Sequence, residues 1–340
     1  MEKRFLKRGI AALCALCALT FSGCAEKKAE TTFLAMDTVM SVSVYGAKAQ
    51  AAADACRAEV EGLEKKLSVT DADSEIYAVN ASGGAPTAVS AETAELIEKA
   101  LEMCRRTDGA LDITVYPVVR AWGFTTGEYR VPSAEEIAGL LENVDYTRVS
   151  VENGAVTLPD GMELDLGAVA KGYTADRLAE MLSGMGVRSA LLNLGHNIQL
   201  IGSKPDGSDW VIAVQSPEGG GYAGTLAVSG CAVVTSGGYE RFFTDENGKT
   251  HHHIIDPTTG QSADSGLASA TIVGKSGLVC DALSTAVFVM GAERAAALWR
   301  ESSDFEMVLI GTDGGITVTE GIAKVFTPTD ADAEITVVTR

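Results

Sequence analysis

At residues 165–172 the chain reads Asp165-Leu166-Gly167-Ala168-Val169-Ala170-Lys171-Gly172, where a strand is expected to end and a helix to begin. The start of a helix has unpaired backbone N–H groups and the positive end of the helix dipole, so it suits phosphate oxygens. Lys171 adds a positive charge for the same anion. An ordinary helix start with a solvated lysine explains the pattern equally well. The segment therefore predicts a strand-to-helix junction and a candidate phosphate site.

Patterns upstream of this junction predict further elements. Apolar residues alternate with serines at residues 40–44, which indicates a half-buried strand. Apolar residues spaced by three and four then indicate a helix, and Ser90 is expected to cap a second one. A hairpin is predicted to turn at Asn153-Gly154, a pair that favours tight turns.

Downstream, strands and helices continue without a repeat. Leu178 and Leu182 predict a helix, followed by strands at residues 189–194 and 210–215 and a hairpin near Asn247-Gly248. A helix is expected near residues 280–289 and a strand at 307–310. Hairpins mixed with helices indicate an α+β fold with a mixed, largely antiparallel sheet and packed helices. No low-complexity linker interrupts residues 33–340, so we expect one catalytic domain.

The first two dozen residues are typical of a bacterial lipoprotein leader. Four basic residues lie within residues 1–8, and the apolar run at 10–22 is shorter than the roughly 20 residues that span a bilayer. The run ends in Gly23-Cys24, like a lipobox, although Phe21 stands where leucine is usual. We expect a lipoprotein signal peptide over residues 1–23, lipidation of Cys24 and a lipidated tether over residues 24–32. Ordinary cleavage beside an incidental cysteine is the alternative.

Such an anchor implies a location on the extracytoplasmic side of the cell membrane, held by acyl chains such as palmitate. Removal of residues 1–23 takes away four basic residues and one acidic residue. The remaining 23 basic and 45 acidic residues give a formal net charge of −22. An acidic body is repelled by anionic lipid. The lipid anchor, and not electrostatic attraction, would therefore hold the protein at the membrane.

Composition restricts the class of protein. The chain has 340 residues, 46% of them hydrophobic and 21% charged, which is typical of a folded globular protein. Its formal charge of −19 argues against a nucleic-acid partner, because binding of phosphate backbones needs a basic face. A nucleotide is still compatible, since a metal ion and a few donors can offset its charge locally.

Cysteine spacing indicates no metal or disulfide framework. Cys14 and Cys17 fall in the leader. Four further cysteines are widely spaced in apolar contexts, so buried free thiols are expected, with two disulfides as the alternative. They are Cys56, Cys104, Cys231 and Cys280.

Several common kinds of site do not fit the spacing. The chain has no G-x-G-x-x-G after a strand and no G-x-S-x-G elbow, which disfavours a Rossmann site and a serine hydrolase. Gly274-Lys275-Ser276 imitates a Walker A end, but Ser269 occupies the position of the upstream glycine. Three consecutive histidines at 251–253 would point to alternate faces of a strand, so a histidine zinc site is not favoured.

Two oxygen-rich segments are more specific. Asp281 and Thr285 lie at i and i+4, on one face of the expected helix, and are hard ligands of the kind that Mg²⁺ prefers. Helix capping by Asp281 and a backbone contact of Thr285 would be the plainer explanation. The segment His252–Gly260 ends a strand in a Pro/Gly turn, in which Asp256 would ordinarily bond its own backbone.

Together the motifs resemble the FAD:protein FMN transferases, the ApbE family, in order and over essentially the whole mature chain. The matching pieces are Met36-Asp37-Thr38, Leu67-Ser68 with Asp73-Ser74-Glu75, Gly109–Thr114 with Trp122-Gly123-Phe124, Asp165–Gly172, Asn193-Leu194-Gly195, Ser236-Gly237 with Tyr239-Glu240-Arg241, His253–Gly260 and Asp281–Thr285.

The resemblance implies that FAD is cleaved at its pyrophosphate and FMN is attached to a threonine or serine of an acceptor protein, with release of AMP. It implies a set of FAD contacts at Met36, Ala110, Leu111, Asp112, Asp165, Lys171 and Ile255. Magnesium would be held by the carbonyl of Ala168, by Asp281 and Thr285, and with a contribution from Ser284. Some relatives have an aromatic residue where this chain has Thr70. The acceptors that the family suggests are flavoproteins of membrane or extracytoplasmic redox systems.

The chemistry needs a base for the acceptor hydroxyl. His253 is our candidate, because an imidazole titrates near working pH. Asp256 is expected either to orient that histidine or to fix the turn. Two rival functions are a hydrolase, in which water replaces the acceptor hydroxyl, and a lipoprotein that binds flavin without chemistry.

Overall fold

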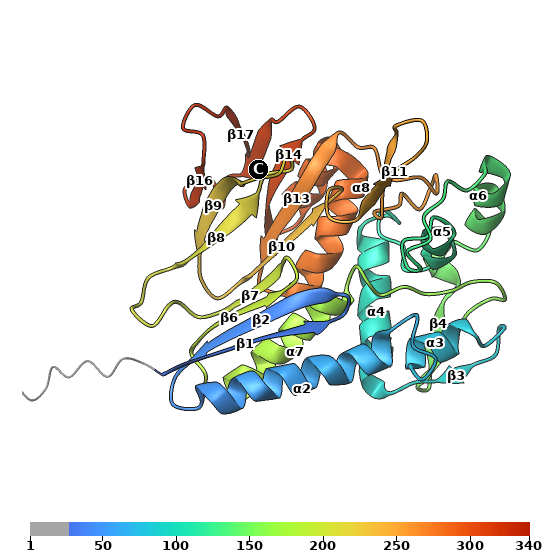
Figure 1. The fold of residues 1–340 in the computed structure, drawn as a ribbon, viewed down its shortest axis with the longest axis horizontal. Coiled ribbons are helices and arrows are strands. Elements are labelled where there is room, and N and C mark those ends of the chain that lie inside the picture. The colour runs from blue at the N-terminus through green and yellow to red at the C-terminus, as the bar shows by residue number, and fades with distance from the viewer. Residues whose placement is uncertain (1–26) are drawn as a thin grey trace, which may run out of the picture.

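The computed structural model describes residues 27–340, so the expected signal peptide and Cys24 lie outside the described residues. Figure 1 shows helices of very different lengths around one large sheet. The helices are α2 (Ala49–Leu67), α3 (Glu75–Asn80), α4 (Ala91–Arg106), α5 (Tyr116–Ala121), α6 (Ala134–Leu141), η1 (a 3₁₀ turn, Tyr146–Arg148), α7 (Ala170–Gly184) and α8 (Gly277–Glu301).

The main sheet has nine strands and runs antiparallel except where its last two neighbours pair in parallel. In spatial order its strands are β1 (Lys28–Ala35), β2 (Thr38–Tyr45), β6 (Ser189–Leu194), β7 (Asn197–Ile201), β10 (Ala232–Gly237), β13 (Leu267–Gly274), β14 (Phe305–Gly311), β15 (Ile316–Thr319) and β17 (Ile335–Val338). Three small sheets are formed by β16 (Phe326–Pro328), β9 (Tyr222–Val228) and β8 (Trp210–Gln215); by β3 (Thr87–Ala88), β5 (Ala155–Thr157) and β4 (Ser150–Glu152); and by β11 (Phe242–Thr244) with β12 (Thr250–His252).

The main sheet is buried on both faces. In β14, Met307 and Leu309 pack into the core with α4 and α8, whereas Val308 and Ile310 pack against β8, β9 and β16. Successive side chains of a strand point to opposite faces, so this alternation shows helices on one face and a second sheet on the other. At the other end, α2 and α7 cover β1, β2 and β6 (Figure 1).

This architecture confirms the predicted α+β fold with a mixed, largely antiparallel sheet in one domain. The strands expected at residues 189–194 and 210–215 are β6 and β8, and both predicted hairpins form. Ser90 caps α4, since its hydroxyl accepts a hydrogen bond from the Thr93 N–H. The cysteines Cys56, Cys104, Cys231 and Cys280 are free and buried, as expected.

Three boundaries differ from expectation. Residues 28–32 of the expected tether belong to β1, which pairs with β2 along its whole length. No strand precedes the 165–172 segment, because Glu163 makes only an isolated bridge with Val115 and the chain then turns into α7. The helix expected at 280–289 runs from Gly277 to Glu301, with a break in helical geometry at Gly291.

Helices α7 and α8 touch through two glycines. A Cβ on Gly172 would overlap the carbonyl of Gly277 and lie 2.6 Å from the Cβ of Asp281. The carboxylate of Asp176 in α7 also accepts hydrogen bonds from the N–H groups of Gly277 and Leu278, at 2.6 and 3.0 Å. The start of α8 is thereby fixed against the start of α7, which sets the position of Asp281.

Along residues 27–340, no helix is both long enough and apolar enough to cross a membrane.

Candidate active site

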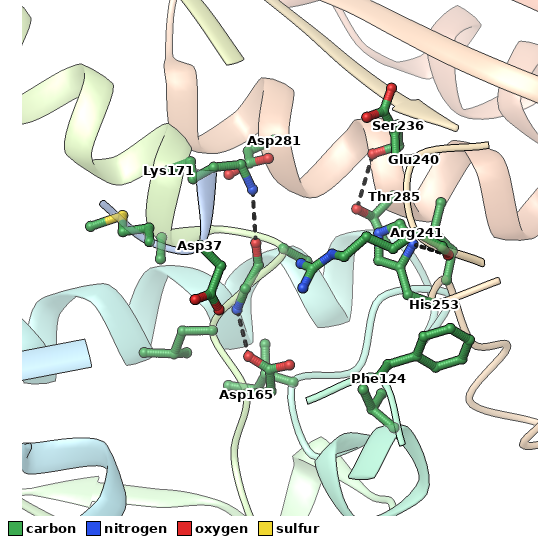
Figure 2. Close-up of a pocket in the computed structure, with 18 of the residues that line it drawn as sticks. Asp37, Phe124, Asp165, Lys171, Ser236, Glu240, Arg241, His253, Asp281 and Thr285 are labelled. Atoms are coloured by element: carbon green, nitrogen blue, oxygen red, sulfur yellow. Dashed lines mark hydrogen bonds between the residues drawn. The ribbon is translucent and has the colours of Figure 1, made fainter. Parts of the chain in front are cut away.

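A cavity of about 720 Å³ opens where the β1–β2 turn, the start of α7, the end of β10 and the first turns of α8 meet. It is lined by both polar and apolar side chains, several of them charged, as Figure 2 shows. Of the predicted site residues, it brings together Met36, Ala110, Leu111, Asp112, Asp165, Ala168, Lys171, His253, Ile255, Asp281 and Thr285. Ser284 and Asp256 do not line it.

Two tight hairpin turns form one wall of the cavity. Met36 and Asp37 join β1 to β2, and Gly195 and His196 join β6 to β7; all four residues have positive φ. Because β2 pairs with β6, the two turns lie next to each other. Left-handed backbone is unusual for residues other than glycine, and such strain concentrates at functional sites. The Met36 N–H is held by the Glu64 carboxylate at 2.7 Å.

Two cations face the cavity without a carboxylate partner. Among residues 27–340, no carboxylate lies within ion-pair distance of Lys171 or Arg241. The Lys171 amine instead donates to the carbonyl of Gly167 at 3.3 Å (Figure 2). Burial raises the pKa of Asp165, and the charges of Arg241 and Lys171 oppose that rise. Free cations of this kind suit an anionic ligand.

Asp281 is buried and faces the start of α7. Its Oδ2 accepts the Gly172 N–H at 2.8 Å. Gly172 is the third residue of α7, so its N–H has no carbonyl partner within the helix, and Asp281 supplies one. Ala168 precedes the helix and lines the cavity. Burial raises the pKa of Asp281, and the charge of Lys171 opposes the rise. A buried carboxylate in such a position favours a bound cation.

Of the two hydroxyl groups that follow Asp281 in α8, only that of Thr285 belongs to a residue that lines the cavity. Ser236 Oγ lies 3.3 Å from Thr285 Oγ1, which lines the cavity, and 2.8 Å from Ser284 Oγ. Ser284 also donates to the Asp281 carbonyl at 2.8 Å and is fully buried. The structure therefore turns Ser284 toward its own helix and Ser236, and it does not bring this predicted ligand to the cavity.

His253 lies at the opposite wall. Its Nδ1 is 3.2 Å from the carbonyl of Arg241, and because a carbonyl only accepts, Nδ1 must carry the proton. Nε2 is then unprotonated. Burial, followed by the charge of Arg241, lowers the pKa of His253 to about 3. The expectation that this imidazole titrates near working pH is therefore wrong for the free protein.

Asp256 fixes the turn and does not orient His253. Its Oδ1 accepts the Thr258 N–H at 2.8 Å, and its carbonyl accepts the Gly260 N–H at 2.8 Å. Asp112 is likewise occupied: its carboxylate accepts from the N–H and hydroxyl of Thr114 and from the Tyr146 N–H. Asp112 thus shapes the loop that carries Ala110 and Leu111 into the cavity.

Residues 36–309 match the ApbE family. The chain belongs to the ApbE family. A relative named FAD:protein FMN transferase from Treponema pallidum is 34% identical over 85% of this chain and 86% of its own length. Among solved structures, the ApbE protein of Thermotoga maritima superposes with a TM-score of 0.83 at 32% identity, covering 88% of this chain and 99% of that one. The flavinyl transferase ApbE of Pseudomonas stutzeri superposes with a TM-score of 0.79 at 28% identity, covering 88% of this chain and 97% of that one.

Three residues of this ApbE site were not predicted to act. Arg241 belongs to a quoted motif, but nothing in the spacing shows that its guanidinium enters the cavity (Figure 2). His196 pairs with Glu240, Nδ1 to Oε1 at 2.9 Å, and this contact raises the pKa of His196. Asn197 lies against Asp281, fully buried, and neither of its amide atoms has a partner of normal hydrogen-bond geometry among residues 27–340.

Proposed function

We propose that this protein transfers FMN from FAD to a threonine or serine hydroxyl of an acceptor protein and releases AMP. The observation that carries the proposal is one cavity that holds a buried carboxylate, a neutral imidazole and two cations that have no carboxylate partner within residues 27–340. Relatives that span most of the chain are named for the same transfer. The cavity volume of about 720 Å³ is in the range of sites for small ligands and cofactors.

The transfer is a substitution at phosphorus. The acceptor oxygen forms a bond to the phosphorus that carries riboflavin, and the bond from that phosphorus to the bridging oxygen breaks. AMP leaves with the bridging oxygen, and the hydroxyl proton goes to a base. Lys171 and Arg241 would bind the pyrophosphate and offset the charge that develops on AMP.

The oxygen donors around Asp281 fit Mg²⁺. They are one carboxylate, the carbonyl of Ala168, which precedes α7, and the Thr285 hydroxyl, with Asn197 beside them. Among the described residues no group of three His, Cys, Asp or Glu side chains could hold a metal, so such an ion would rely on neutral oxygens and phosphate. Bound there, Mg²⁺ would supply charge neutralisation at the pyrophosphate.

Apolar parts of the cavity would receive the rings of FAD. Met36, Leu111 and Ile255 line it, together with Ala110 from the loop shaped by Asp112. His253 would accept the hydroxyl proton on Nε2, since Nδ1 is engaged with Arg241. A bound pyrophosphate would offset the cations that depress the pKa of His253 and so make it a better base.

We further propose that Cys24 is lipidated after removal of residues 1–23, and that the enzyme acts on the extracytoplasmic side of the cell membrane. Its acceptors would be flavoproteins of membrane or extracytoplasmic redox systems. The basic leader, the short apolar run and Gly23-Cys24 support the anchor. Growth with a radiolabelled fatty acid tests it: label on the wild type and none on Cys24→Ser is expected, and equal label on both contradicts the anchor.

Product analysis tests the transferase activity. The protein is incubated with FAD, Mg²⁺ and a threonine-bearing acceptor domain, and AMP, FMN and acceptor-bound flavin are quantified. Equal amounts of AMP and acceptor-bound flavin, both lost in chelator, are expected. Free FMN with AMP would indicate a hydrolase. Intact FAD that stays bound equally in chelator would indicate a binding protein.

A further inference from the structure

The ion pair between His196 and Glu240 lies at the cavity wall but has no part in the steps described above. His196 belongs to the β6–β7 turn, and Glu240 belongs to residues 238–241, which connect β10 to β11. Both residues line the cavity, with Nδ1 and Oε1 2.9 Å apart. The pair therefore ties a turn of the main sheet to a loop that reaches over the cavity.

Two hydrogen bonds hold the backbone of the turn that presents His196. His196 has φ +65°, a conformation that residues with a Cβ rarely adopt. Its N–H is held by Asn193 Oδ1, and its carbonyl accepts the Thr235 N–H, each at 3.3 Å. Side chains held in sparsely populated backbone conformations are concentrated at functional sites. The main sheet thus presents the imidazole toward the Glu240 carboxylate.

The loop that Glu240 anchors carries Arg241, and Arg241 serves the cavity in two ways. Its carbonyl accepts the N–H of His253 at 3.1 Å and lies 3.2 Å from His253 Nδ1. Its guanidinium extends into the cavity (Figure 2). Within the loop, the hydrogen bond from the Glu240 N–H to the Gly237 carbonyl is long, at 3.4 Å. The pair with His196 is therefore the short side-chain contact that fixes this segment.

We propose that His196 and Glu240 are positioning residues, which hold Arg241 for the pyrophosphate and, through the Arg241 carbonyl, hold His253 in its reactive tautomer. This inference rests on the proposed flavin transfer and adds two residues to it. Neither side chain is required to touch the reacting atoms. Loss of either should disturb both substrate binding and the chemical step, because one loop serves both.

The test uses Glu240→Ala, His196→Asn and the double variant in the full-length mature protein. Asparagine tolerates the left-handed backbone, so His196→Asn removes the imidazole without straining the turn. Each single variant should weaken FAD binding and lower kcat, each by roughly 10-fold, because small misplacements of binding groups are costly. Tm should shift by less than about 3 °C, since exposed ion pairs contribute little to stability.

A comparison of the single and double variants shows whether His196 and Glu240 act through one contact or independently. The double variant should be no worse than the poorer single variant, and Glu240→Ala should have no further effect on FAD affinity in an Arg241→Met background. Glu61→Gln breaks another exposed ion pair, with Arg57 at 2.7 Å on α2, and should leave all values unchanged. The inference would be overturned if the losses of FAD affinity and kcat in the double variant were the product of those in the single variants. It would also be overturned if the single variants had the FAD affinity and kcat of the wild type.

FAD affinity is measured by flavin fluorescence, independently of turnover. If the wild type fails to flavinylate an acceptor, the proposed transferase fails. The affinities of the same variants for FAD would still support or overturn the positioning role.

Discussion

At the scale of single residues, the site depends on groups whose charge states the fold has changed. The imidazole of His253 has a pKa of about 3, so it is neutral over the physiological range. The carboxyl of Asp281 has a raised pKa because it is buried. Each shift disfavours the charged form of the group, and a bound anion beside His253 or a bound cation beside Asp281 would offset it.

His253→Ala should retain FAD binding but transfer FMN about 10²–10⁴-fold more slowly, because it removes the proposed base and not a phosphate contact. Its kcat at saturating FAD and acceptor, with FAD affinity measured separately, checks this. Weakened FAD binding with unchanged kcat would instead make His253 a flavin contact.

The same variant should alter stability at acid pH. Unfolded His253 binds a proton below about pH 6.5, whereas the folded form does so only near 3. Folding stability therefore falls as pH drops through this window. Without the imidazole this contribution disappears, so the loss of Tm between pH 7 and pH 4.5 should be smaller for His253→Ala than for wild type. Equal losses would show that the folded pKa is not depressed.

Asp281→Asn should abolish Mg²⁺-dependent transfer while raising the Tm of the metal-free protein by roughly 2–4 °C, because it removes a buried charge and still accepts from the Gly172 N–H. The raised pKa means that folding is penalised as pH rises through it. The Tm gain should accordingly be larger at pH 7 than at pH 4. A lower Tm at both values, or retained turnover, would contradict this account.

At the scale of secondary structure elements, the contact between α7 and α8 positions the proposed metal ligands. Gly172 leaves no room for a Cβ, and its N–H contacts Asp281 across the interface. Asp176 fixes the first turn of α8 through the N–H groups of Gly277 and Leu278. A small shift between the two helices would separate Ala168 from Asp281 and Thr285.

Gly172→Ala should lower the free energy of unfolding by about 2–3 kcal/mol, because the added methyl group overlaps α8. Gly62→Ala is the matched control: it lies exposed on α2 with no atom within 4 Å of the added Cβ, and should stabilise by about 0.5–1 kcal/mol. Urea unfolding of both variants measures the difference. Similar effects at the two positions would show that the helices are not in tight contact.

Elements with local signals could be predicted from the sequence. Asn153-Gly154 specifies its hairpin, and Ser90 specifies the start of α4, because each acts on its own backbone. The supposed strand before Asp165 could not be excluded, since apolar alternation occurs there without a partner strand. Likewise, the composition of residues 28–32 predicts a tether, but these residues form part of β1 because β2 pairs with them.

At the scale of the whole molecule, the site is formed by segments far apart in the chain. Most residues that the family motifs single out, including Lys171 and Asp281, line the cavity. The motifs could not show that Ser284 faces Ser236 or that Arg241 enters the cavity, because those orientations depend on the packing of α8, β10 and the β11–β12 hairpin. They also left open which of its two expected roles Asp256 has. His196 escaped notice because only the fold reveals its left-handed backbone.

The intact mass of a threonine-bearing acceptor domain, measured after incubation with this protein, FAD and Mg²⁺, shows directly whether FMN is transferred. We expect a mass gain equal to FMN less one water, which is lost when EDTA is present and when that threonine is replaced by valine. An acceptor of unchanged mass, recovered together with free FMN and AMP, would contradict the proposed transfer.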